Sequence, residues 1–111
     1  MTRPRSTKER GWSGLDALQK RVVEWQSENF PGCQEWELAL GVCEEGGELA
    51  RSILKLHRKM RKLNADESSL RDAIGDIVIF LFGICASRGW RMSVILQSTG
   101  EQVLKRKWKR S

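Results

Sequence analysis

The chain has 111 residues, of which 40% are hydrophobic and 31% charged, and its formal net charge is +6. These proportions fit one globular domain and exclude a disordered chain. The longest apolar run, residues 77–86, is too short for the roughly 18 residues that a membrane helix needs, so we expect no membrane partner. The basic N-terminus is not followed by an apolar segment, which argues against a secretory signal.

The three cysteines, Cys33, Cys43 and Cys85, are odd in number and show no C-x-x-C spacing. This usage predicts reduced thiols and a cytoplasmic location. A single histidine, His57, leaves too few ligands for a Cys/His zinc site. Nothing around His57 marks the strained turn or the paired base of a nucleophilic triad.

Basic charge is concentrated at the two ends of the chain. Residues 1–10 carry +3 and residues 105–111 carry +5, which leaves −2 for the body between them. Such ends suit a polyanionic partner, either nucleic acid, an acidic surface or nucleotide phosphates. For the N-terminus a solubilising role is simpler. We expect residues 1–13 to form a flexible basic tail and residues 14–111 a single domain.

Apolar residues recur at helical spacing, which predicts an all-α fold of four helices. The first helix should follow an N-cap at Ser13 and end at the breaker cluster 29–32. Its apolar stripe comprises Leu15, Leu18, Val22 and Trp25. The remaining helices are expected over residues 34–60, from Ser68 or Ser69 to Arg88 with Gly89 as the cap, and over residues 93–108. Short connections predict a four-helix bundle whose thin core is completed by homo-oligomerisation.

The second predicted helix has acidic residues at positions where its apolar stripe should continue. The stripe comprises Leu38, Val42, Leu49, Ile53 and Leu56. Glu45 occupies the stripe position between Val42 and Leu49, with Glu44 beside it and Glu48 one turn later. Three helix-weakening glycines, Gly41, Gly46 and Gly47, indicate that something approaches the backbone closely.

The third helix repeats the anomaly. Asp72 and Asp76 lie four residues apart, and therefore on one helical face. Asp76 directly precedes an apolar run over residues 77–86 whose helix should be buried nearly all round. We therefore expect Asp76 at the edge of the core.

Carboxylates gathered in an apolar interior repel one another and lose hydration, whereas a hard divalent cation needs oxygen ligands of this kind. The sequence thus predicts a four-carboxylate site for Mg²⁺ or Mn²⁺, made by Glu45, Glu48, Asp72 and Asp76. Simpler interpretations stay open. They are a solvated face in which Glu44, Glu45 and Glu48 meet Arg51, Lys55 or Ser52, a capping box from Ser69 to Asp72, and a core Asp76 paired with Arg21 or Arg71.

Two segments resemble the acidic signatures of the MazG-like nucleotide pyrophosphohydrolases, which are all-α NTP pyrophosphatases. Residues 44–49, EEGGEL, are similar to the E-E-x-x-E-L motif, and residues 72–81, DAIGDIVIFL, to the second acidic helix. LQKRV at 18–22, WELAL at 36–40 and VLKRKWK at 103–109 also fit, so the resemblance covers about residues 15–109.

The resemblance implies Mg²⁺-dependent hydrolysis of a nucleoside triphosphate to the monophosphate and pyrophosphate, in a homodimer or dimer of dimers. Carried over by position, Glu45, Glu48 and Asp76 would be metal ligands. Glu44 would be a ligand or the base that orients water, so Glu44 and Glu45 are the catalytic candidates. The usual glutamate three residues before Asp76 is replaced by Ala73, and Asp72 is the available substitute.

Phosphoryl transfer depends on positioning and on neutralising charge, so basic side chains should meet the outer phosphates. The candidates are Lys55, Arg106 and Lys109, with solvated surface charge as the simpler interpretation of each. Another departure from the family pattern, Lys107, would strengthen phosphate binding. The base should stack on Trp25, Trp36 or Trp108, although Trp25 also fits core packing.

We expect nucleotide-pool housecleaning to be the role. The same fold and carboxylates also serve phosphoribosyl-ATP pyrophosphatase. Two non-enzymatic hypotheses compete, a basic helical binder of nucleic acid and a scaffold inactivated by the change at Ala73. Against nucleic-acid binding, neither tail has an evident recognition helix and the acidic cluster goes unexplained.

Overall fold

The structure is a computed structural model that describes the backbone of residues 7–58 and 67–107, with side chains from residue 14 onward. These ranges contain four helices and no strand: α1 (Thr7–Asn29), α2 (Glu35–His57), α3 (Glu67–Ser87) and α4 (Met92–Lys105). The prediction of an all-α chain with four helices is confirmed. Within the described ranges, no helix is both long and apolar enough to span a bilayer.

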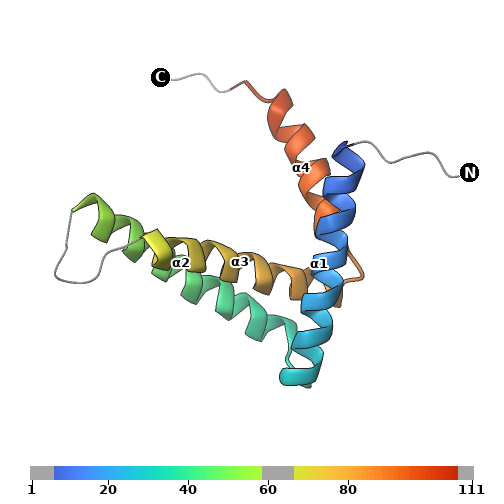
Figure 1. Cartoon of the computed structure of the whole chain (residues 1–111), viewed down its shortest axis with the longest axis horizontal. Helices are drawn as coiled ribbons and strands as arrows, with labels where there is room; N and C mark the ends of the chain where they lie inside the picture. Colours follow the sequence, from blue (N-terminus) through green and yellow to red (C-terminus); the bar gives the residue numbers. More distant parts are fainter. Residues whose placement is uncertain (1–6, 59–66, 108–111) are drawn as a thin grey trace, which may run out of the picture.

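Helices α2 and α3 lie side by side in antiparallel directions and make the most extensive packing in the chain. Helix α1 crosses the C-terminal half of α3, and α4 runs beside the N-terminal half of α1, away from α2 (Figure 1). The α2–α3 contact is closest at Gly41, where a Cβ atom would lie 2.6 Å from the Phe80 ring. Gly41 is therefore a close-approach glycine, as predicted. Gly46 and Gly47 are not, because a Cβ on either would meet nothing within 4 Å.

The core lies where α1, α3 and α4 meet. Its buried members are Phe82, Cys85 and Met92, and Phe82 is only 1% exposed. The partly buried side chains packed against them are Leu15, Val22, Val23, Val78, Leu81 and Ile95. Leu18 and Trp25, expected on the core stripe of α1, are instead about half exposed, because the α1 face that meets the core is turned toward Gln19.

Gln19 is a buried polar residue that the sequence analysis did not single out. Its Nε2 donates to the Trp90 carbonyl oxygen at 3.1 Å, and its Oε1 accepts from the Met92 backbone N–H at 2.8 Å. Trp90 belongs to the connection between α3 and α4, and Met92 is the first residue of α4. Gln19 thus satisfies buried backbone groups and fixes the start of α4 on α1.

Several helix ends differ from the expected positions. Helix α1 begins at Thr7, so Ser13 lies inside the helix and is not its N-cap. Helix α2 ends at His57 and α4 at Lys105, earlier than expected. Residues 59–60 and 108 of these predicted helices lie outside the described residues. The cap at Gly89 is confirmed, with φ at +72°.

The surface of the chain retains many large apolar side chains. Every residue of the apolar run 77–86 of α3 is buried or half-buried, as expected, whereas Ile74, before this run, is 51% exposed, and Ile53 of the predicted α2 stripe is also exposed. Helix α4 has little packing along its C-terminal half, where Leu104 is 86% exposed. The other exposed large apolar side chains on α2 and α4 are Trp36, Leu40, Leu54, Val94, Leu96 and Val103. The fold of one chain therefore leaves apolar faces on α2, α3 and α4 without cover.

Candidate active site

Charges of acidic residues on both α2 and α3 act on Glu45. Its side chain is half-buried, at the stripe position that the sequence analysis assigned to it. Partial loss of hydration raises the pKa of the Glu45 carboxyl, and the charges of Asp76, Glu48 and Glu44 raise it further. Of these three charges that of Asp76 has the largest effect, and it comes from the neighbouring helix. The α2–α3 packing therefore brings four carboxylates into one electrostatic neighbourhood.

The other predicted ligands are more exposed than Glu45. Glu44 and Glu48 lie on the solvent side of α2, and Glu48 makes an exposed ion pair with Arg51, Oε1 to Nη1, at 3.9 Å. Such a pair adds little stability. Glu48 thus lies on a solvated face and pairs with Arg51, as the simpler interpretation had it, whereas Glu45 is half-buried and does not fit that interpretation.

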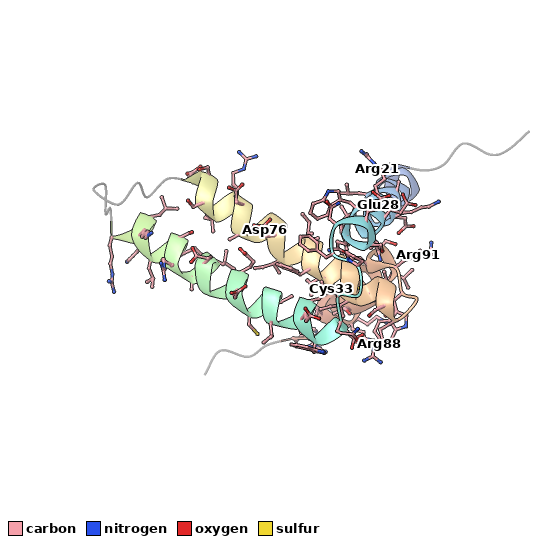
Figure 2. All side chains as sticks on the ribbon, turned by 90° about the horizontal axis from the view of Figure 1, so that it is seen from below. Arg21, Glu28, Cys33, Asp76, Arg88 and Arg91 are labelled. Carbon is pink, nitrogen blue, oxygen red and sulfur yellow. The ribbon has the colours of Figure 1, made fainter. Side chains whose placement is uncertain are left out.

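Asp76 is exposed, rather than at the core edge as expected, because it lies before the C-terminal half of α3, where α1 crosses that helix. It lies partway along α3, and Arg21 projects from α1 at a distance from it (Figure 2). Among the described residues, no ion pair joins Asp76 to Arg21 or Arg71.

Asp72 is also exposed, one turn before Asp76, and its charge is not among those that raise the pKa of Glu45. Because α3 already begins at Glu67, Ser69 stands inside its first turn and not at the N-cap position of a box leading to Asp72.

The residues around Glu45 have the donor atoms and the charge that a hard divalent cation prefers, but their side chains are not yet arranged as a ligand set. Within the described ranges, no three His, Cys, Asp or Glu side chains are gathered closely enough to hold a metal. Glu48 and Asp76 are exposed, however, so both can change rotamer without disturbing the core. The negative charges near Glu45 raise its pKa by repulsion. A divalent cation that prefers oxygen ligands would offset this repulsion. The carboxylates thus fit Mg²⁺ or Mn²⁺ by donor type and charge.

An open cavity of about 910 Å³ adjoins this cluster at Asp76. It lies between the C-terminal end of α1, the turn at residues 30–34, α2 and α3. Trp25 and Phe30 line it with ring centroids 5.7 Å apart and an interplanar angle of 71°. The apolar walls are completed by Val23, Leu38, Ile79 and Phe80. A planar aromatic ligand could pack in this cavity with its polar end toward Asp76.

Phe30 was missed as a binding residue, because its position next to Pro31 and Gly32 indicated only the end of a helix. The turn places this ring beside Trp25 instead of in the core. The sequence signal for Phe30 was an aromatic residue in a helix-breaking segment directly before the acidic helix.

The rim of the cavity is fixed by an ion pair that joins the start of α2 to the end of α3. Glu35 accepts from Arg88, Nε to Oε2 and Nη2 to Oε1, both at 2.7 Å. The Ser87 hydroxyl also lies 2.7 Å from Glu35 Oε2. The hydrogen bonds from Arg88 and Ser87 lower the pKa of Glu35 to about 2. Figure 2 shows Arg88 at the same end of the helix pair as Cys33.

The predicted phosphate-binding residues are not brought together in one chain. Lys55 is half-buried on α2, about two turns beyond Glu48. Arg106 and Lys107 follow the end of α4, which points away from the α2–α3 pair (Figure 1). Trp36 is 64% exposed and does not line the cavity. Lys109 and Trp108 lie outside the described residues.

The chain was compared with protein-family models, with curated proteins and with solved structures. None of the three comparisons found a match.

Proposed function

We propose that this protein is a Mg²⁺-dependent nucleoside triphosphate pyrophosphohydrolase, which converts an NTP or dNTP and water to the monophosphate and pyrophosphate. One observation carries the proposal: Asp76 both lines the aromatic cavity and belongs to the group of carboxylates whose charges act on Glu45. The similarity of residues 44–49 and 72–81 to MazG-like motifs supports the same activity.

The two parts of the site suit the two parts of a nucleotide. The base packs against the aromatic side chains of the cavity, Trp25 and Phe30. The triphosphate extends past Asp76 toward Glu45 and Glu48, where direct contact would be repulsive. Mg²⁺ held by Glu45, Glu48 and Asp76 would neutralise charge on the phosphate oxygens. Asp72, one turn before Asp76 on α3, would be the fourth ligand.

The reaction needs a water molecule placed on the α-phosphorus. The water oxygen forms a bond to phosphorus while the bond to the bridging oxygen of the β-phosphate breaks, so pyrophosphate leaves. Glu44 is exposed beside Glu45, and it orients the water and accepts its proton. Lys55, on the same helix, faces the departing phosphates.

The proposal includes a homodimer or a dimer of dimers. The exposed apolar side chains of α2 and α4, among them Leu40 and Leu104, support it because a second copy would cover them. The basic end of α4 lies far from the carboxylates of its own chain. In a second copy, Arg106 and Lys107 would supply the positive charge that the acidic cluster lacks.

The proposal is tested by incubating the protein with a nucleotide panel and Mg²⁺, and identifying the product as pyrophosphate or phosphate. We expect pyrophosphate, and we expect its release to disappear in Glu48→Ala and Asp76→Ala proteins that remain folded. Glu24→Ala, on the exposed face of α1, is the matched control and should keep full activity. No turnover of any nucleotide, or activity that survives in Asp76→Ala, would contradict the proposal.

A further inference from the structure

The polar side chains that line the aromatic cavity are unequal in hydrogen-bonding character. Glu35 and Glu37 reach it from α2, and Gln26 and Ser27 from α1. An ionised carboxylate only accepts hydrogen bonds, whereas an amide or a hydroxyl can also donate. Glu35 and Glu37, like Asp76, which also lines the cavity, therefore accept hydrogen bonds from a ligand as carboxylates and do not donate.

The Gln26 amide is held in one orientation by α3. Its Nε2 donates to the Ile79 carbonyl oxygen at 3.1 Å. Its Oε1 packs against Gly83, 2.8 Å from where a Cβ atom would stand. Because Gln26 and Gly83 both line the cavity, the Gln26 oxygen is a further acceptor at its wall.

Glu35 keeps its acceptor character at neutral pH, and Glu37 has one carboxylate oxygen free of protein partners among the described residues. Arg88 and Ser87 lower the pKa of Glu35 to about 2, so this side chain stays ionised. Glu37 accepts the Gln34 backbone N–H at 3.1 Å through Oε1, which leaves Oε2 for a ligand. The Ser87 hydroxyl donates inside the protein, to Glu35 or to the Ile84 carbonyl oxygen.

We propose that this cavity selects nucleobases that carry an exocyclic amino group, and that it disfavours their deaminated counterparts. The inference rests on the proposed function, because it takes the cavity ligand to be a nucleobase. An amino group donates to Glu35, Glu37 or the Gln26 oxygen. A carbonyl oxygen in the same place would face acceptors and leave them unpaired, which a polar site rejects strongly.

The test uses pairs of nucleotides that are related by deamination, dCTP with dUTP and ATP with ITP. We expect kcat/KM to favour the amino-bearing member of each pair by about tenfold or more. Calorimetric titration of dCMP and dUMP in the presence of Mg²⁺ should show the same order of affinity, and this measurement does not depend on turnover.

Glu37→Gln is the matched variant, because glutamine can keep the hydrogen bond to the Gln34 N–H while adding a donor to the cavity. Its preference for dCMP should fall toward unity. Equal affinities, tighter binding of dUMP, no binding of either nucleotide or an unchanged preference in Glu37→Gln would overturn the inference. Pyrophosphate release without base preference would overturn this inference alone. Binding of dCMP without any pyrophosphate release would overturn the proposed function instead.

Discussion

Glu45 of α2 and Asp76 of α3 interact across the helix pair, and the charge of Asp76 helps to raise the pKa of the Glu45 carboxyl. The close packing of Gly41 against Phe80, one turn away on α2, brings these helices together. A raised carboxyl pKa means that the folded chain resists ionisation of Glu45. This cost is present at a pH above the raised pKa, and it disappears at a pH below the ordinary pKa of glutamate.

Replacing Glu45 by glutamine should stabilise the protein in the absence of metal, because it removes the repulsion from Asp76. It should also abolish the rise in Tm that Mg²⁺ or Mn²⁺ produces by binding the folded state. Both effects are measured by thermal unfolding with and without 5–10 mM metal, an ordinary range for such experiments. Glu24→Gln should change neither quantity. A Glu45→Gln protein that is less stable without metal and still gains stability with it would contradict the account.

Two glycines of α2 should respond to alanine in opposite directions. Gly41→Ala places a Cβ within 2.6 Å of the Phe80 ring, and such overpacking costs about 1–3 kcal/mol. Gly47→Ala meets open space and gains helix propensity, about 1 kcal/mol at most. Urea unfolding of the two variants measures the free energies. Destabilisation of similar size in both would show that a further contact reaches Gly47.

The ion pair between Glu35 and Arg88 should make stability depend on acidic pH. The pKa of Glu35 is lowered from 4.5 to about 2, so its contribution is complete above pH 4.5 and is lost as the pH falls toward 2. Arg88→Ala should lower Tm by a few degrees at pH 7 and lose part of this pH dependence, as measured by thermal scans between pH 2 and 7. Arg51→Ala, which breaks the longer 3.9 Å pair with Glu48, is the control and should change Tm less. An Arg88→Ala profile parallel to that of the unmodified protein would contradict the role of this pair.

Two inactive variants should complement each other if a second copy completes the site. Glu48→Ala removes a proposed ligand, and the double variant Arg106→Ala with Lys107→Ala removes the basic end of α4. Co-refolded mixed oligomers should regain activity, since one of their sites then has both intact parts. Light scattering checks that the mass is a multiple of the monomer mass. A monomeric protein, or no recovery on mixing, would contradict this part of the proposal.

The helical pattern was enough to predict the number of helices and their approximate centres, because each carries apolar residues at helical spacing. It also placed Glu45 correctly, since a carboxylate on the stripe must lie against the neighbouring helix. It could not place Trp25 or Gln19, because the face of α1 that meets the core depends on tertiary packing. The ion pair between Glu35 and Arg88 could not be predicted either, because a contact between residues 53 positions apart leaves no local sequence pattern.

Of all these measurements, a diffraction experiment on crystals soaked in Mn²⁺ tests the central claim most directly. The account predicts an anomalous peak among Glu45, Glu48 and Asp76, with their carboxylate oxygens turned toward it at about 2.0–2.3 Å, the range of hard-cation coordination. Crystals that show these three side chains directed apart into solvent, with no peak between α2 and α3, would contradict it.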